Sequence, residues 1–594
     1  MSGTSRKTWL YKVLKWRYRN ISEKNFILIL SILIGFIAGL VSLVLKNITH
    51  LIQRLVQGDI ISWQNTLYFI TPVVGLLIVY LFNKYIVKKE IKSAIPLILY
   101  ALSKKGAVIK SIHGYLPLIL APITVGFGGS VGLLGPAISS GSAFSSSIST
   151  LFHVSRKTRV LLIGCASAGA ISAVFKSPLA GLVFAVEVFS LDLTFASLLP
   201  LLFASVSSIV TSYFFIGDEV LFRFEVLEKF SIQDIPFFII LGIGTAFASI
   251  YFTKMYFWIL KLFERFEKKI YRLLVAGMTI GVMLYFIPPL YGEGLGFIND
   301  LLHGDYMKAI GKTPFQNIES NIWIIIGLLA GITIFKAIAM TATFAAGGYG
   351  GIFIPTMVMG SALGNVVSKI INNIGLGFQV SESNFTLLGM AGLISGVLHA
   401  PLTSIFLIAE ITTSYELFVP LMITTAISFI ISKNKVDYTI YTRELAEQGN
   451  LLTHDKDQTV LTLLNLKDCI ETNFITVNPD YTLKQLLSEA VAKSNRNLFP
   501  VVNKRGMLIG IVSLDDIRDI MFDITKYHTV MVEDLMSPVA YKIIEEEDDA
   551  KSAMKKFQDS SAWNLPVVRR NKYIGFISKS KLLTSYRRQL IKFA

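Results

Sequence analysis

The chain has 594 residues, of which 53% are hydrophobic and 16% are charged, and its mean hydropathy is +0.58. This composition is far too apolar for a soluble globular protein and excludes that class. The formal net charge of +16 is explained by basic loops at the cytoplasmic face of a membrane, and it does not require a nucleic-acid partner. Two cysteines, Cys165 and Cys469, support neither a disulfide framework nor a metal cluster.

Residues 1–25 are basic and lead into the first long apolar stretch without a cleavage site of small residues. We therefore expect no cleaved signal peptide and a cytoplasmic N-terminus. Several apolar stretches are long enough to cross a membrane, which takes about 20 residues. Others, at 115–143 and 345–366, are broken by glycine and proline. The long apolar stretches cover residues 26–46, 66–82, 160–189, 196–216, 235–262, 271–288, 322–343 and 386–432.

The composition changes near residue 434, after which the density of charged residues rises and no further apolar stretch occurs. This change predicts a membrane domain followed by a linker and a soluble region, with the C-terminus also cytoplasmic. The predicted parts are a cytoplasmic segment (1–25), a membrane domain (26–445, with halves of about 26–215 and 235–445), a linker (446–465) and a soluble region (466–594, divided at about 466–527 and 530–590).

The membrane domain contains an internal repeat. Residues 168–187 align with 391–410, and both segments contain an Ala-Gly pair, a central Pro-Leu and a final glutamate. Upstream, the glycines and the proline of 132–141 match those of 351–360 in the same order. Repeated segments that are interrupted by glycine and proline indicate the binding site of a transporter.

Three of these segments place a proline where a short helix is expected to begin, at Pro96, Pro136 and Pro355. Proline suits the first helical turn because its missing N–H has no partner there. The remaining free N–H groups carry the positive end of the helix dipole, so several such ends that meet would bind an anion. Small-residue packing between helices would explain one such motif. Three together favour an anion site.

The same segments resemble the signatures of the CLC chloride channels and transporters. Residues 92–96 are similar to the family's Gly-Ser-Gly-Ile-Pro, and 351–355 match its Gly-x-Phe-x-Pro. Residues 132–136 resemble Gly-Lys/Arg-Glu-Gly-Pro, and 399–410 resemble its Ala-Pro-Leu-Thr helix. The resemblance implies an all-α polytopic membrane domain built as an inverted repeat with broken helices. It also implies a homodimer in a bacterial inner membrane, with chloride or another small anion as the substrate.

The resemblance also assigns roles to individual residues. The hydroxyl of Ser93 would contact the central anion. The central tyrosine would be Tyr438, with Tyr441 as the alternative, and either residue could instead be an interfacial anchor. The backbone amides expected to line the outer half of the path are those of Ile352, Phe353 and Ile354.

Several departures from the family pattern bear on function. Leu134 stands where the family has the glutamate that gates the path and carries protons, and Val188 stands where transporters often have a second glutamate. Without these carboxylates, stoichiometric proton countertransport lacks its chemistry. Glu187, the repeat mate of Glu410, is expected to bond within the membrane domain. Lys92 could concentrate anions at an inner mouth or extend its ammonium to the interface.

The soluble region reads as two strand–helix–strand units and resembles a tandem pair of CBS domains. Adenosine ligands of that family are bound by a Ser or Thr and an Asp three residues later. Ser513 and Asp516 fit this pattern, whereas Ser578 and Lys581 fit it poorly. Many such pairs only dimerise, so both outcomes remain open for an adenine nucleotide.

The leading hypothesis is a passive, anion-selective CLC channel or uncoupled transporter that is regulated by cytoplasmic CBS domains. The alternative is a proton-coupled or fluoride-exporting CLC antiporter. A divalent-cation channel would need more acidic residues in the apolar stretches, and the intact 351–355 motif argues against a non-conducting scaffold. No motif suggests an enzyme, a metal site or a required cofactor.

Overall fold

The computed structural model describes residues 15–17, 19–61, 68–88, 94–103, 106–191, 194–217, 231–310, 321–375, 377–412, 414–447 and 464–593. The chain divides into two compact units, Met1–Asn450 and Leu451–Ala594. Within the described part of the first unit, seven helices are long and apolar enough to cross a membrane, so the protein is an integral membrane protein.

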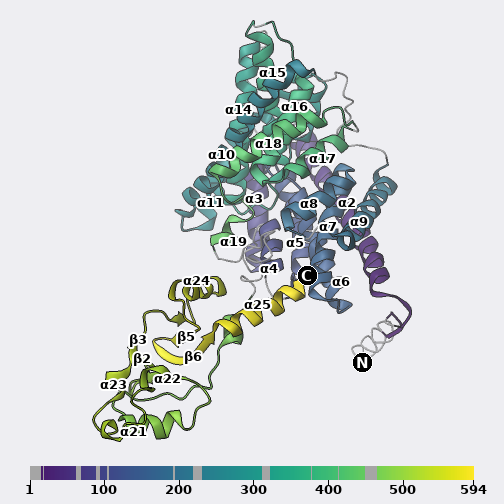
Figure 1. Ribbon diagram of the computed structural model, residues 1–594. Coiled ribbons are helices and arrows are strands. Elements are labelled where there is room, and N and C mark those ends of the chain that lie inside the picture. Colours follow the sequence, from purple (N-terminus) through teal and green to yellow (C-terminus); the bar gives the residue numbers. More distant parts are fainter. Residues whose placement is uncertain are drawn as a thin grey trace. The chain divides into compact units, whose positions relative to one another are not determined.

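The first unit is helical and consists of two groups of helices. In Figure 1 the helices α2 and α5–α9 lie together, and α10, α14–α16 and α18 form a second group. The first half contains α2 (Glu23–Arg54), η1 (Leu55–Ile61), α3 (Thr71–Phe82), η3 (Asn83–Val87), α4 (Ala94–Ser103), α5 (Ile112–Gly126), α6 (Leu134–Leu151), α7 (Arg156–Phe175), α8 (Pro178–Phe189) and α9 (Phe195–Ile216). The second half contains η4 (Ile232–Asp234), α10 (Ile235–Glu264), α11 (Lys269–Phe286), η5 (Pro288–Leu290), α12 (Leu295–Leu302), α13 (Tyr306–Ile310), α14 (Ile322–Ala345), α15 (Phe353–Asn373), α16 (Glu382–Leu398), α17 (Pro401–Ile411), α18 (Phe418–Lys435) and α19 (Arg443–Glu447).

The helices break at equivalent points of the two halves. Helix α7 is followed by Lys176 in the left-handed conformation (φ 55°), and Pro178 then begins α8. Helix α16 is followed by His399 in the same conformation (φ 54°), and Pro401 begins α17. Left-handed backbone ends a helix, and proline then opens the next one. The apolar stretch predicted at 160–189 is therefore divided between two helices, the 20-residue α7 and the 12-residue α8.

Two partly buried glutamates join the halves reciprocally. The Glu187 carboxylate, near the end of α8, accepts hydrogen bonds from the N–H groups of Leu402 (3.0 Å) and Thr403 (2.8 Å) at the start of α17. The Glu410 carboxylate, near the end of α17, accepts from Leu179 (3.0 Å) and Ala180 (2.9 Å) at the start of α8. Each helix end meets the opposite end of its repeat mate, so α8 and α17 run antiparallel. Equivalent helices that run in opposite directions confirm the expected inverted repeat.

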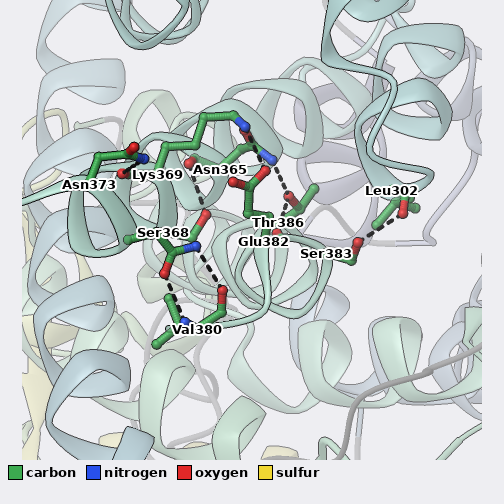
Figure 2. Close-up of polar contacts among 10 residues, drawn as sticks. Leu302, Asn365, Ser368, Lys369, Asn373, Val380, Glu382, Ser383 and Thr386 are labelled. Atoms are coloured by element: carbon green, nitrogen blue, oxygen red, sulfur yellow. Dashed lines mark hydrogen bonds and ion pairs between the residues drawn. The ribbon is translucent and has the colours of Figure 1, made fainter. Parts of the chain in front are cut away.

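The far end of α15 is tied to the start of α16 by an ion pair between a buried lysine and a partly exposed glutamate (Figure 2). The Lys369 ammonium lies 2.6 Å from a Glu382 carboxylate oxygen and 4.2 Å from the centre of the Tyr306 ring, and only 2% of the Lys369 side chain is exposed. Glu382 stands in the first turn of α16, where a negative charge is favourable. Around this pair, Asn365 donates to Thr386 (3.3 Å). This cluster ties the C-terminal part of α15 to the first turns of α16.

The second unit contains two three-stranded sheets. In each sheet a long antiparallel hairpin is covered by a helix whose apolar side chains are buried. Val477 adds a single parallel bridge to Val501 of the first hairpin. The elements are η7 (Leu466–Cys469), α21 (Leu483–Gln485), η8 (Leu486–Val491), β1 (Leu498–Val502), β2 (Leu508–Ser513), α22 (Leu514–Ile517), η9 (Ile524–Lys526), α23 (Val532–Leu535), β3 (Ser537–Pro538), β4 (Ile543–Ile544), α24 (Ala550–Ser560), β5 (Asn564–Arg569), β6 (Lys572–Ser578) and α25 (Lys579–Phe593).

We predict that losing one charge of the Lys369–Glu382 pair destabilises the protein more than losing both charges. Glu382→Gln leaves a buried ammonium without its counter-charge, and because 32% of the Glu382 side chain is exposed, the loss should stay below the roughly 3–5 kcal/mol of a fully buried pair. The double variant Lys369→Met/Glu382→Gln removes both charges and should recover most of that loss. The measurement is the temperature at which half of the detergent-solubilised protein loses its monodisperse chromatographic peak.

The control for this experiment is Lys308→Met. Its ion pair with Asp300 is 3.4 Å long, and 74% of the Lys308 side chain is exposed, so its loss should have little effect. A double variant that is less stable than Glu382→Gln alone would show that packing of the Lys369 side chain, and not its charge, is what matters.

Candidate functional site

The N-termini of α6 and α15 face each other across a short backbone pairing. The N–H of Gly132 donates to the carbonyl of Gly351 (2.9 Å), and the N–H of Gly351 donates to the carbonyl of Gly132 (2.7 Å). These two glycines are equivalent positions of the repeat. A residue that pairs with its own equivalent lies on the axis relating the halves, so this axis passes between the two helix ends.

The approach of these segments leaves no room for side chains. A Cβ atom added at Gly351 would lie 2.8 Å from the backbone nitrogen of Gly135, and one added at Gly135 would lie 3.0 Å from the Cα of Gly351. Neither backbone can give way without breaking the pairing. Glycine is therefore required at both positions, and what faces the space between the helices is peptide backbone.

The three prolines singled out in the sequence occupy the same place in three helices. Pro96, Pro136 and Pro355 are each the third residue of their helix, in α4, α6 and α15 respectively. Each helix thus begins with N–H groups that have no intrahelical partner, together with a proline that has no N–H to satisfy. Lys92 and Ser93, which precede α4, lie outside the described residues.

A small cavity lies where the starts of these three helices meet. Its volume is about 20 Å³, which is enough for one water-sized species. Among the described residues that line it, none carries an acidic side chain. The lining consists of Ile95, Pro96, Gly135, Tyr256, Phe344, Gly350, Gly351, Ile352, Ile440 and Tyr441.

Tyr441 supplies the one side-chain donor of the cavity lining that has no partner within the described structure. Its hydroxyl is buried without a hydrogen-bond partner, and the residue is 5% exposed. Burial raises the pKa of Tyr441, so the hydroxyl stays protonated and can donate. Tyr438 is 44% exposed and does not line the cavity. The structure thus places Tyr441, the alternative to Tyr438, at the cavity, and the role of either tyrosine in anion binding stays a prediction.

The other predicted residues lie at the two paired helix starts. Leu134 is the first residue of α6 and is 1% exposed. Ile352 occupies the N-cap position of α15 and lines the cavity. Phe353 and Ile354 are the first two residues of α15, and their side chains are buried. The ring of Phe353 packs against Phe175 and Phe184 of the first half. Only the backbone of this turn is thus left to face the space between the helices.

Sequence reasoning missed Glu293. This residue follows η5 in a loop of the second half, and its carboxylate accepts a hydrogen bond from the N–H of Leu133 (2.7 Å), directly before α6. The signal in the sequence is an acidic residue between two glycines, Gly292 and Gly294, within a strongly apolar region. Nothing in the sequence itself relates that residue to a helix that begins about 160 positions earlier.

In the soluble unit, Ser513 and Asp516 are close together and bond to each other. The Ser513 hydroxyl donates to the Asp516 carboxylate (2.8 Å), which also accepts from the Ser513 N–H (2.7 Å). The two residues form a capping box at the start of α22. Ser578, at the corresponding position of the second CBS-like half, donates instead to Glu471 (3.1 Å). Nucleotide binding at Ser513 and Asp516 stays a prediction.

Comparison with known families agrees with the two-unit division. A family model described as "Voltage gated chloride channel" matches residues 74–433, and the CBS domain model matches 466–523 and 532–588. The chain is 23% identical over 541 residues to "Chloride channel protein CLC-f" of Arabidopsis thaliana, covering 80% of this chain and 67% of that protein. It is 24% identical over 441 residues to "H(+)/Cl(-) exchange transporter ClcA" of Vibrio cholerae, covering 70% and 89%.

Solved structures share the fold. A slow cyanobacterial Cl-/H+ antiporter superposes with a TM-score of 0.61 at 19% identity, covering 72% of this chain and 99% of that one. A eukaryotic CLC transporter superposes with a TM-score of 0.59 at 15% identity and covers 94% of this chain and 99% of its own. A CLC-type fluoride/proton antiporter superposes with a TM-score of 0.56 at 20% identity, covering 70% and 97%.

Proposed function

Because the chain belongs to the voltage-gated chloride channel family, we propose that its membrane unit conducts chloride or another small anion passively, without stoichiometric proton exchange. The CBS domains of the soluble unit regulate this conduction. The members of the family named above are channels or transporters. Passive conduction is the behaviour of a channel, and exchange of anions for protons is the behaviour of an antiporter.

The observation that carries the proposal is the cavity at the three helix starts. It offers the backbone ends of α4, α6 and α15 and the unpartnered hydroxyl of Tyr441. A buried donor without an acceptor is costly, so a ligand with acceptor character is favoured there. Helix dipoles stabilise a negative charge without a cation at the centre, which allows fast release.

The absence of coupling is supported by the residues at the expected proton positions. Leu134 and Val188 have no titratable group. The neighbouring carboxylate of Glu187 and its repeat mate Glu410 are occupied as helix caps. The alternative is a proton-coupled antiporter for chloride or fluoride, which is favoured by the printed functions of several relatives. A joint measurement of anion and proton fluxes separates these possibilities.

We propose further that the protein is a homodimer in a bacterial inner membrane with both termini in the cytoplasm. Basic residues at the end of α18, Lys433 and Lys435, support a cytoplasmic location for that end of the membrane unit.

The first functional prediction is anion flux that is not linked to uphill proton movement. Purified protein in chloride-loaded liposomes should release chloride when a potassium ionophore carries the compensating charge. An imposed chloride gradient should drive no uphill proton uptake, which is measured with a pH electrode in the same preparation. Liposomes without protein provide the baseline, and reproducible proton pumping against its gradient would establish the antiporter instead.

The second prediction concerns the two tyrosines. Tyr441→Phe removes one hydrogen bond to a bound anion, and hydrogen bonds to charged groups are worth about 1.5–3 kcal/mol. The dissociation constant for chloride, measured by calorimetry on the detergent-solubilised protein, should rise about tenfold or more. Tyr438→Phe is the matched control and should bind as the wild type does. Equal weakening in both variants, or in neither, would remove Tyr441 from the site.

The third prediction is the oligomeric state. Light scattering coupled to size-exclusion chromatography in mild detergent should give twice the mass of the 65.9 kDa chain. A monodisperse monomer that retains full anion flux after reconstitution would refute the dimer as the functional unit.

A further inference from the structure

A second cavity lies in the soluble unit, at the tip of the hairpin formed by β5 and β6. Its volume is about 680 Å³, which is in the range of pockets that bind small molecules. Its charged lining residues are Lys467, Arg569, Arg570, Lys572, Glu545 and Glu546. Four basic and two acidic side chains leave an excess of two positive charges, which favours an anionic ligand.

The charge of Glu545 is already balanced within the protein. Its carboxylate accepts hydrogen bonds from Nε and Nη2 of Arg569, the second at 2.7 Å, and the Lys467 ammonium lies 3.3 Å away. Only 5% of the Glu545 side chain is exposed, whereas 57% of Arg569 and 65% of Lys467 are exposed. The acid thus holds two cations in place, and both keep more than half of their side chains open to a ligand.

Arg570 and Lys572 are the basic residues of the lining that Glu545 does not hold. Both are exposed, and neither forms an ion pair within the described residues. Arg570 and Asn571 form the two-residue turn of the hairpin, with φ angles of 48° and 63°. Such turns favour asparagine, aspartate or glycine, so local folding gives no reason for an arginine at 570. Its guanidinium is therefore better explained by a ligand than by the turn.

One polar side-chain atom of the lining lacks a partner. The Tyr573 hydroxyl is buried without a hydrogen-bond partner in the part of the chain that the structure describes. Burial raises the pKa of Tyr573, so the hydroxyl stays protonated and remains a donor. A buried donor without an acceptor is costly, and an anion in the cavity would supply an acceptor.

This cavity is separate from the serine–aspartate pattern of the CBS resemblance. The seven-residue β6 begins at Lys572 and ends at Ser578, and an extended strand of that length spans about 20 Å. At the tip, the N–H of Tyr573 donates to the carbonyl of Gly506 in the turn of the other hairpin (3.0 Å). Ser513 is the last residue of β2, at the far end of that hairpin. Both serines therefore lie at the opposite ends of their hairpins from the cavity.

We propose that this cavity binds the phosphomonoester group of a small molecule or a lipid headgroup, with Arg570 and Lys572 as its principal cations. A phosphomonoester carries a charge of about −1.5 to −2 at neutral pH, which matches the positive excess of the lining. A guanidinium binds phosphate oxygens through two parallel hydrogen bonds, and an ammonium adds a point charge. Binding here is independent of whether the membrane unit conducts an anion.

The test measures binding of radiolabelled glycerol 3-phosphate to the whole chain in mild detergent by equilibrium dialysis. The double variant Arg570→Gln/Lys572→Gln should raise the dissociation constant at least about tenfold, because the loss of a hydrogen bond between charged groups has about that effect. Both side chains are exposed, so the variant should fold as the wild type does. No saturable binding to the wild type, or equal binding by the double variant, would overturn the site.

The matched control is Lys484→Gln/Lys493→Gln, which removes the same formal charge from exposed side chains that do not line the cavity. Its dissociation constant should equal that of the wild type. Equal weakening in both double variants would show attraction to overall charge and would refute a local site. Asp516→Asn should also bind as the wild type does, and weakening in this variant alone would place the phosphate at the serine–aspartate pattern instead.

Two probes distinguish the two sources of a phosphomonoester. Dihexanoyl phosphatidic acid, used below its micelle concentration, is compared with glycerol 3-phosphate as a competitor of the bound label. Tighter binding of the lipid assigns a headgroup, and tighter binding of glycerol 3-phosphate assigns a free metabolite. Dihexanoyl phosphatidylcholine has a phosphodiester next to a positive choline and should displace no label. Displacement by phosphatidylcholine would show recognition of acyl chains and would contradict a phosphate site.

Discussion

The pairing of Gly132 with Gly351 is the contact on which the rest of the membrane unit depends. It joins equivalent positions of an inverted repeat and brings the starts of α6 and α15 to the same point. Without it, two helix dipoles would end separately, and each would have to be satisfied by its own cap or by water. With it, their positive ends act together on one small space that also receives the start of α4 and the Tyr441 hydroxyl.

Three acidic side chains of the membrane unit share one kind of contact. Glu187, Glu410 and Glu293 each accept hydrogen bonds from the backbone at or beside the start of a helix. Glu187 and Glu410 bond to α17 and α8, whose starts lie away from the cavity lining, and they lock the two halves together. Glu293 alone bonds beside α6, which reaches the cavity. The same chemistry thus holds helix starts at three places of the membrane unit.

The ion pair and hydrogen bonds that stabilise the membrane unit lie away from the cavity. The Lys369–Glu382 pair lies toward the far end of α15 from the helix start that meets the cavity. Buried serine and threonine hydroxyls bond mainly to backbone carbonyls of their own or adjacent helices. The helix starts can therefore remain open to a ligand because the packing of the helices elsewhere holds them in position.

Much of this protein was determined by the sequence alone. Composition identified a membrane protein, and the aligned segments 168–187 and 391–410 located the repeat and its broken helices. Proline and glycine spacing placed the starts of α4, α6 and α15, because these residues act on the backbone locally and need no partner. The same locality explains why Ser513 and Asp516, only three residues apart, could be recognised as a unit.

Only the tertiary structure decided which distant residues reach those helix starts. Spacing in the sequence favours Tyr438 over Tyr441, but Tyr438 is exposed and Tyr441 is buried at the cavity. Glu293 reaches the N–H of Leu133 because a loop held by Lys336 brings it there. Local rules describe where a backbone turns and which N–H groups it leaves free. They cannot say which carboxylate or hydroxyl meets those groups, because that depends on how the two halves pack against each other.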